Sequence, residues 1–256
     1  AAMTGLLLAL NLPATLPLWK AAVGCIFAIA VVKQLFGGLG CNFANPAITG
    51  RVFLLLSFAG DMTTWVKPFY YHGLSLSNQL SSSAGSLDLD AVTSATPLVT
   101  GTESLSNLFL GNVGGCIGET SALALLLGGL FLIFTRIISP STPIAYLGSL
   151  GILTFFHALA TGGSLTEVPY ALLSGGVMIG AFFMATDYVT TPITTKGKWI
   201  FGIGCGILTF VIREFASMPE GCSFSILLMN LLTPYIDKFT MTKPLGAKPI
   251  KKKEEA

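Results

Sequence analysis

Four long apolar runs in the second half of this sequence constrain its fold more than any other feature. Each is close to the roughly 20 residues that an α-helix needs to cross a lipid bilayer. Helices also satisfy every backbone polar group internally, which lipid requires. We therefore expect membrane spans over 119–138, 142–161, 168–186 and 199–217.

The low content of charged residues supports the same fold class. Only 10% of the 256 residues are charged, whereas a soluble domain carries about 25%. A chain with so few charges cannot cover itself with a water-facing surface, so its expected solvent is the lipid bilayer. The predicted fold is an all-α integral membrane protein, with one polytopic domain over 1–256. The sequence shows no basic patch interleaved with aromatic residues, so nucleic acid is not an expected partner.

The remaining apolar segments are shorter or interrupted. One span is expected over 18–36, and a Gly-rich break at 37–42 separates it from a short apolar piece over 45–58. The last piece covers 222–236 and also follows a break. Irregular backbone at membrane depth is tolerated where it lines a cavity, so both breaks are candidate binding regions.

Two parts of the chain share residues at a nearly constant offset. The matching positions are Trp19 with Trp199, Gly24-Cys25 with Gly204-Cys205, Lys33-Gln34 with Arg213-Glu214, and Gly40-Cys41 with Gly221-Cys222. The two copies are predicted to cross the membrane in opposite directions, as inverted repeats of transport proteins do. The second copy has five spans and the first only three, so we expect two further helices before Ala1.

The distribution of positive charge predicts the orientation in the membrane. We place the Lys-rich tail (238–256) in the cytoplasm, because Lys and Arg are enriched on that side. The turns at Arg136 and at 196–198 then also face the cytoplasm. The long loop 61–118, which holds a single Lys, lies outside.

Possible metal ligands are scattered along the sequence. The five Cys form no C-x-x-C pair and only two His are present, whereas zinc and iron–sulfur sites need grouped ligands. We expect the Cys side chains to pack within helices, and we expect no metal site contained in this chain alone. A site shared with another protein of a complex stays open.

The loop 61–118 is polar and Ser-rich, as a solvated linker would be, but one run in it has a specific order. Asp90 is followed by Ala-Val and then by Thr93-Ser94-Ala95-Thr96-Pro97. This run resembles the flavin-attachment motif of the family that contains RnfD, from the Rnf electron transport complex, and NqrB, from the Na⁺-translocating NADH:quinone reductase. The resemblance implies that Thr96 carries FMN through a phosphodiester bond.

Three further stretches extend this resemblance over nearly the whole chain. They are 33–47, 185–192 and 213–221. The resemblance implies two inverted five-helix repeats in a bacterial cytoplasmic membrane, which agrees with the internal repeat except for the two absent helices. The short external loop and the Lys-rich tail look more like RnfD than like NqrB.

Attachment of FMN to Thr96 needs help, because a threonine hydroxyl is a poor nucleophile at neutral pH. The resemblance implies an external, Mg²⁺-dependent flavin transferase that uses FAD as the donor. Asp90 would act either in recognition or in activating the hydroxyl. Ser94 leaves the approach to Thr96 uncrowded, and Pro97 favours an extended backbone before it.

The resemblance also implies a second, non-covalent riboflavin between the helices. We expect it at the breaks 37–46 and 218–224, with breaks that only bend the fold as the alternative. Charged residues inside a membrane are expensive and are functional candidates. Those within or beside the expected helices are Lys33, Arg51, Asp187, Arg213, Glu214 and Glu220. For a role in ion coupling we name Asp187 and Glu214 first.

The predicted function is that of a membrane component of an ion-translocating ferredoxin:NAD⁺ oxidoreductase. It would relay electrons through FMN and riboflavin, with Na⁺ or H⁺ movement arising in the complex with the other Rnf subunits. No independent turnover is expected, because the chain has no nucleotide-binding glycine motif. Three alternatives stay open: the NqrB component of the quinone reductase, a channel or transporter without flavin, and a membrane scaffold in which Thr96 is unmodified.

Overall fold

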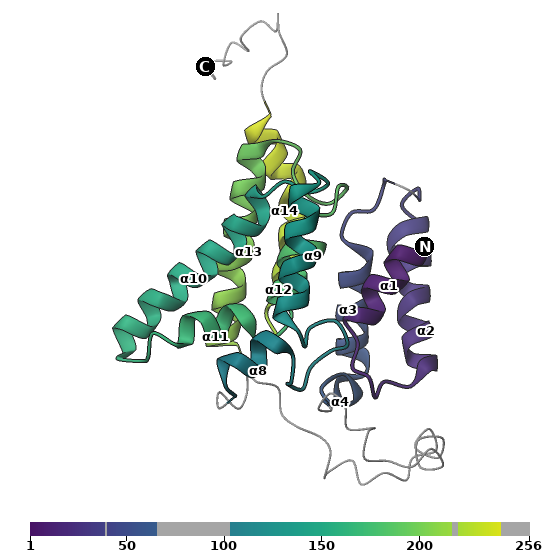
Figure 1. Cartoon of the computed structure of the whole chain (residues 1–256). Helices are drawn as coiled ribbons and strands as arrows, with labels where there is room; N and C mark the ends of the chain where they lie inside the picture. The colour runs from purple at the N-terminus through teal and green to yellow at the C-terminus, as the bar shows by residue number, and fades with distance from the viewer. Residues whose placement is uncertain (39, 66–102, 217–219, 242–256) are drawn as a thin grey trace, which may run out of the picture.

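The computed structural model describes residues 1–38, 40–65, 103–216 and 220–241 (Figure 1). Within these ranges every regular element is a helix. The elements are α1 (Ala2–Leu10), α2 (Leu18–Ile26), η1 (Phe27–Gln34), α3 (Pro46–Ser57), α4 (Ala59–Met62), α8 (Leu105–Leu110), α9 (Ala122–Phe134), α10 (Ser141–Thr161), α11 (Glu167–Leu173), α12 (Val177–Ile179), η4 (Gly180–Met184), α13 (Thr195–Phe215) and α14 (Cys222–Thr240). The predicted all-α fold is confirmed.

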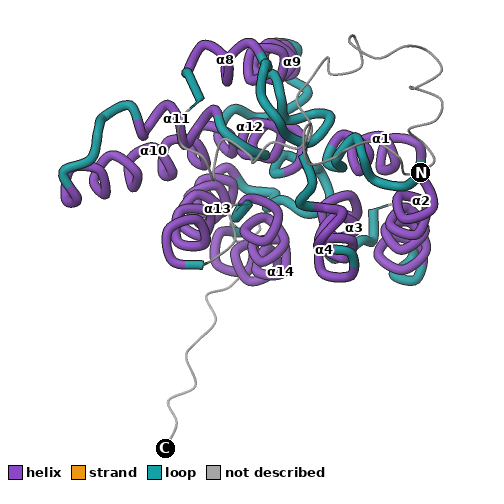
Figure 2. The backbone as a smooth tube through the Cα atoms, turned by 90° about the horizontal axis from the view of Figure 1, so that it is seen from below, coloured by secondary structure: helices purple, strands orange, loops and turns teal. Residues whose placement is uncertain are grey.

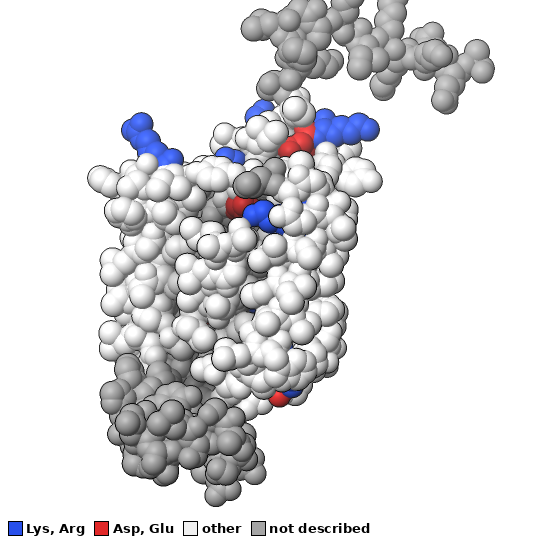
Figure 3. Space-filling model, turned by 90° about the vertical axis from the view of Figure 1, so that its right-hand side faces the viewer, with Lys and Arg blue, Asp and Glu red and all other residues white. Residues whose placement is uncertain are grey.

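Two helices of the described chain are long and apolar enough to cross a membrane. They are α10 and α13, each with 21 residues, and a third span results if α11 and the α12–η4 segment are taken as one bent span. The helices α3 and α9 are apolar but shorter. On the face shown in Figure 3, charged side chains gather towards the two ends, and a wide band between them is largely uncharged. These features fit a bundle that lies in a bilayer.

The expected continuous span over 168–186 is wrong, because the helix breaks in its middle. The two parts meet at 64° around Ser174, Gly175 and Gly176. Gly175 has a φ of +65°, a conformation that residues with a Cβ rarely adopt. The guanidinium of Arg213 donates to the carbonyl oxygens of Ala171 (2.7 Å) and Ser174 (3.1 Å), which the break leaves without helical partners.

Other boundaries also differ from the expected ones. The helix α9 covers 13 residues of the expected 119–138 span and begins after Ser121, whose hydroxyl accepts from the N–H of Ala124. The helix α14 is longer than the expected 222–236 and continues through Pro234 to Thr240. Part of the loop 61–118 is itself helical, because α8 forms between a Ser104 cap and Gly111.

The two copies of the repeat are inverted in the structure. The α2–η1 and α3 helices run in the opposite directions to α13 and α14 (Figure 1). A matched glycine lets each pair of helices approach closely. A Cβ on Gly24 would lie 2.4 Å from Leu54 of α3, and one on Gly204 would lie 2.4 Å from Met229 of α14. The two glycines, 180 residues apart in the sequence, therefore have the same role in packing: each allows a neighbouring helix to approach closely.

The helices α10 and α13 run parallel and pack along their length. A Cβ on Gly202 would lie 2.6 Å from Ala145, and one on Gly206 would lie 2.8 Å from the carbonyl oxygen of Tyr146. Small residues allow such close approach of helices in a membrane. Seen along their axes in Figure 2, α13 and α14 lie side by side, with α3 and α2 beyond them. This arrangement brings the break regions of the two copies into one bundle.

Candidate functional site

The predicted site residues fall into two groups. Asp90, Ser94 and Thr96 lie outside the described residues. Asp187 and Glu214 lie within the described residues. Asp187 follows η4, and Glu214 lies in the last turn of α13. Asp187 accepts a hydrogen bond from Thr190 (3.1 Å). The side chain of Glu214 is 37% exposed, and its carboxylate lies 3.8 Å from His157 Nε2.

Asp187 lines a cavity of about 210 Å³ between the two copies of the repeat, which we call the inter-repeat cavity. Its walls come from α1, from the end of η1, the break after it and the start of α3, and from η4 with the segment that follows it. The lining residues are Met3, Thr4, Leu7, Lys33, Gly40, Asn42, Asn45, Pro46, Ala47, Phe183, Asp187 and Val189. The cavity thus includes the break at 37–46 that the sequence singled out.

Three polar groups of the inter-repeat cavity lack partners among the described residues. The hydroxyl of Thr4, a residue only 7% exposed, forms no hydrogen bond there. The Lys33 ammonium has no carboxylate partner within the same part of the chain. Asn42 uses its amide N–H to reach the carbonyl of Ala44 (3.1 Å), which leaves its side-chain oxygen free. The cavity therefore offers donors and an acceptor beside an apolar wall.

Asn45 fixes the shape of this cavity by contacting both copies. Its side-chain oxygen caps α3 by accepting from the N–H of Ala47 (3.0 Å), and its amide donates to the carbonyl of Met184 (3.2 Å). In the orientation that satisfies its neighbours, Asn230 of α14 accepts from the Asn45 N–H (3.0 Å) and donates to Thr190 (3.3 Å). One asparagine thus joins the α3 start to η4 and α14.

A second site, the Arg51 cluster, is buried between the copies. It consists of Asn11, Arg51, Cys116, Glu119 and Glu220. Arg51 Nη1 donates to Asn11 (3.0 Å) and Glu119 (2.8 Å), and Nη2 contacts Cys116 Sγ (3.3 Å) and Glu220. The Arg51 and Glu119 side chains are each 3% exposed. Charges at such depth are expensive unless paired, so the cluster depends on all its members.

The Arg51 cluster lies against the break between α11 and α12. A Cβ on Gly176 would lie 2.7 Å from Glu119 Oε1 and 3.3 Å from Arg51 Nη1. Glu119 and Glu220 also line a cavity of about 10 Å³, which has room for about one water. The ligand atoms of Cys116, Glu119 and Glu220 lie within 4.8 Å of one another. Because Arg51 donates to all three, its guanidinium takes the place that a cation would need.

A third polar group lies inside the second copy. The hydroxyls of Tyr146, Thr209 and Ser225 form a ring, with Thr209 at 2.7 Å from both Tyr146 and Ser225 and Tyr146 at 3.4 Å from Ser225. All three residues are fully buried. The ring joins α10, α13 and α14, so it fixes their register.

Sequence reasoning found some of these residues but not their grouping. It marked Arg51 and Glu220 as charges within or beside helices, and it took Glu119 only as the first residue of a span. The partners are 68 and 169 residues from Arg51. A usable signal was the lone Glu119 before an apolar run, since a buried carboxylate needs a cation partner somewhere in the chain.

Comparison with known proteins supports one family over nearly the whole chain. The sequence profile of the NQR2, RnfD, RnfE family matches residues 1–246. The D subunit of the Na⁺-translocating ferredoxin:NAD⁺ oxidoreductase complex of Acetobacterium woodii is 48% identical over 265 residues, which cover 100% of this chain and 76% of the relative.

Two further relatives agree. The D subunit of the proton-translocating ferredoxin:NAD⁺ oxidoreductase complex of Clostridium ljungdahlii is 43% identical over 96% of this chain and 74% of its own length. The D subunit of the ion-translocating oxidoreductase complex of Stutzerimonas stutzeri is 41% identical over 96% of this chain and 75% of its own length. By these matches and by its helical membrane fold, the chain belongs to the NQR2, RnfD, RnfE family.

Proposed function

We propose that this chain is the RnfD component of an ion-translocating ferredoxin:NAD⁺ oxidoreductase complex and relays electrons through FMN attached to Thr96. The observation that carries the proposal is the identity of 41–48% with the D subunits of such complexes, together with the ordered run Asp90–Pro97. Electron transfer needs the other Rnf subunits as partners, because this chain supplies no nucleotide-binding glycine motif.

Attachment at Thr96 forms a phosphate ester between the threonine oxygen and the FMN phosphate. With FAD as the donor, the bond to AMP breaks and AMP leaves, and the hydroxyl proton passes to a base. A flavin transferase provides this step, with Asp90 and Ser94 as part of the run that it recognises. FMN held there supplies one-electron redox chemistry. The loop that holds Thr96 lies outside the cytoplasmic membrane and the Lys-rich tail inside, as the charge distribution predicts.

The inter-repeat cavity is the proposed site of a non-covalent riboflavin. The free polar groups of Thr4, Lys33 and Asn42 can bond to the polar edge of an isoalloxazine ring, and Phe183 gives it an aromatic wall. A volume of about 210 Å³ is below the ~300 Å³ at which small-molecule pockets usually begin. The residues therefore fit the ring system in part, with the ribityl chain extending out of the cavity.

Asp187 and Glu214 are proposed to take part in coupling electron transfer to Na⁺ or H⁺ movement. Asp187 is supported by its place in the inter-repeat cavity, where its carboxylate would lie beside the flavin. Glu214 is supported by its partial exposure beside His157, where it can exchange a cation with water. If both act, Asp187→Asn and Glu214→Gln each reduce ion uptake by membrane vesicles per electron transferred. A ratio that both variants leave unchanged contradicts the assignment.

The attachment is tested on the full-length protein after denaturing electrophoresis. Under ultraviolet light the wild-type band should fluoresce yellow-green, and Thr96→Ala should abolish the fluorescence. Thr100→Ala, in the same loop, is the matched control and should leave the band bright. A dark wild-type band, or equal loss in both variants, contradicts a flavin ester at Thr96.

The riboflavin site needs a separate readout. Acid extraction of the purified complex releases only non-covalent flavin, which chromatography then identifies. Thr4→Val and Lys33→Gln should lower this fraction, whereas Lys20→Gln, in the same continuous helix as Lys33, should not. The fluorescent band from Thr96 should stay unchanged in all three, so the two assignments can fail independently.

A further inference from the structure

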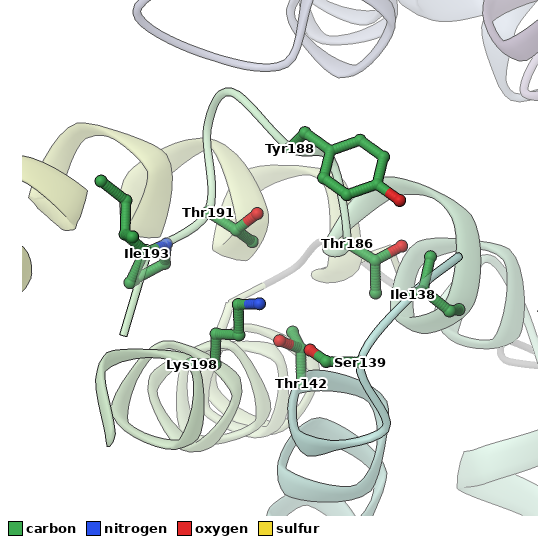
Figure 4. Close-up of a pocket in the computed structure, with 9 residues that line it drawn as sticks. Ile138, Ser139, Thr142, Thr186, Tyr188, Thr191, Ile193 and Lys198 are labelled. Carbon is green, nitrogen blue, oxygen red and sulfur yellow. The ribbon is translucent and has the colours of Figure 1, made fainter. Parts of the chain in front are cut away.

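We infer that a ligand with a phosphate group binds at the end of the bundle where α10 and α13 begin. A cavity of about 200 Å³ lies there, which we call the terminal cavity. It is formed by 138–142 at the start of α10, by 186–193, and by Lys198 in α13. Figure 4 shows Lys198 and Thr142 extending towards the same space, with Thr186 and Thr191 across from them.

The observation that points to a ligand is the hydroxyl of Thr142. The residue is 1% exposed and lines the terminal cavity, yet its hydroxyl has no hydrogen-bond partner within the described ranges. The hydroxyl faces the terminal cavity, so a ligand in the cavity can accept its hydrogen bond. Its neighbours are already engaged, since Thr186 donates to Phe182 (2.6 Å) and Ser139 bonds to Ser141 (3.2 Å). Thr142 is therefore the free hydroxyl donor in the cavity.

The helix ends add positive charge to this donor. Both α10 and α13 are 21 residues long, and neither has an acidic residue in its first turn. Pro140, the cap residue of α10, provides no side-chain hydrogen bond to the first N–H groups. Helix N-termini carry a partial positive charge and bind phosphate readily. The first-turn N–H groups that α10 can offer are those of Ser141 and Thr142, because Pro143 has none and the Ile144 N–H donates to Pro140.

Lys198 makes the site basic. A lysine near the start of a helix opposes the helix dipole, so its position there is unfavourable without a nearby anion. Lys198 is half-buried, lines the terminal cavity and forms no ion pair with any described carboxylate. Asp187 accepts a hydrogen bond from Thr190 (3.1 Å) and Asp237 accepts one from the N–H of Ile193 (3.0 Å), and neither carboxylate pairs with Lys198. The positive charge at the cavity is thus left for a ligand.

A phosphate group matches this set of donors. It offers several oxygen acceptors to one ammonium, one hydroxyl and backbone N–H groups at once. The exposed rim residues Tyr188 and Ile193 add apolar surface beside the polar cavity. Two sources carry this chemistry: the head group of an anionic phospholipid and a soluble phosphate. The experiment separates them.

The test measures protection of a cysteine placed in the cavity. Ser139→Cys is made in full-length protein that also carries Cys41→Ser, which removes the exposed native thiol. The whole complex, in a phosphate-free maltoside detergent, is treated with a maleimide, and peptide mass spectrometry gives the alkylation rate. Dioleoyl phosphatidylglycerol or inorganic phosphate is then added. We expect at least one of them to slow alkylation about tenfold.

Two variants decide whether the protection comes from this site. Lys198→Gln should raise the ligand concentration needed for protection about tenfold, because a charge-assisted hydrogen bond is lost. Lys196→Gln, in the same turn but outside the cavity, should leave it unchanged. Thr142→Val should act in the same direction as Lys198→Gln but less strongly. The midpoint of thermal unfolding, with and without each ligand, gives a second readout that does not depend on the new cysteine.

Each outcome has a defined meaning. Protection by phosphatidylglycerol alone assigns the site to a lipid head group, and protection by inorganic phosphate alone assigns it to a soluble ligand. Protection by both shows that the phosphate group suffices. The proposal is overturned if neither probe slows alkylation and neither probe raises the midpoint of thermal unfolding. It is also overturned by an equal effect of Lys196→Gln and Lys198→Gln.

Discussion

Arg51 of α3 donates to Glu119 across 2.8 Å and so joins the first copy of the repeat to the segment before α9. Both side chains are 3% exposed, which makes this a buried ion pair in a chain with few charges. Glu220, two residues before α14, binds the same guanidinium. One arginine therefore connects three parts of the chain that are distant in sequence, and loss of its charge should lower the stability of the whole bundle.

Replacement of Arg51 by Met should destabilise the protein strongly. It leaves Glu119 and Glu220 buried without a cation, and breaking a buried pair costs about 3–5 kcal/mol. The free energy of unfolding in detergent measures the loss. Lys20→Met, which breaks the more exposed pair with Asp61, should cost about 1 kcal/mol or less. Equal losses in the two variants would show that the buried pair contributes no more than a surface one.

Replacement of Gly176 by Ala should also lower stability. Its φ of −75° suits any residue, so the only obstacle is the Cβ, which would lie 2.7 Å from Glu119 Oε1. Overpacking of this kind costs about 1–3 kcal/mol. Gly148→Ala in α10 is the control, because nothing lies within 4 Å of its Cβ. That change should stabilise by up to about 1 kcal/mol, and thermal unfolding should place the two variants on opposite sides of wild type.

The matched glycines of the two copies, Gly24 and Gly204, should differ in how much stability is lost when each is replaced by alanine. A Cβ on Gly24 meets the branched carbons of Leu54, whereas one on Gly204 meets the end of Met229. Methionine is unbranched and adapts to its surroundings. Gly24→Ala should therefore cost more unfolding free energy than Gly204→Ala, and Leu54→Ala should recover part of the loss in the double variant. A larger cost at Gly204 would contradict this packing.

Removal of the Tyr146 hydroxyl should have a moderate effect. Tyr146→Phe takes one member from the buried ring with Thr209 and Ser225, at a cost of about 1–2 kcal/mol. Tyr235→Phe, at a position 65% exposed on α14, should change the unfolding free energy by less than about 0.5 kcal/mol. Indistinguishable melting curves for the two variants would mean that the ring does not stabilise the bundle.

The fold class and the repeat could be predicted because both depend on local patterns. Apolar runs marked α10 and α13, and glycine and tryptophan at a fixed offset marked the inverted copies. The break at Ser174 could not be predicted in the same way. Two glycines in an apolar run are common in membrane helices, and only the carbonyl contacts of Arg213, which begin 39 residues away, show that the helix ends there.

The sites were predicted only in part, for a related reason. The break at 37–46 pointed to the inter-repeat cavity, because irregular backbone in a membrane needs polar partners. Nothing local connects Asn45 with Met184, 139 residues away, or Thr142 with Lys198. The assignments at Thr96 rest on the order of residues in a loop outside the described ranges and stay predictions.

The spacing of the Arg51 cluster along the chain has a consequence for biogenesis. A ribosome delivers Arg51 to the membrane 68 residues before Glu119 and 169 residues before Glu220. Until then its cationic side chain has no counter-ion from these later segments. The helix that carries Arg51 must therefore stay in a hydrated or protected environment, such as an insertase, until the segments with Glu119 and Glu220 have been inserted.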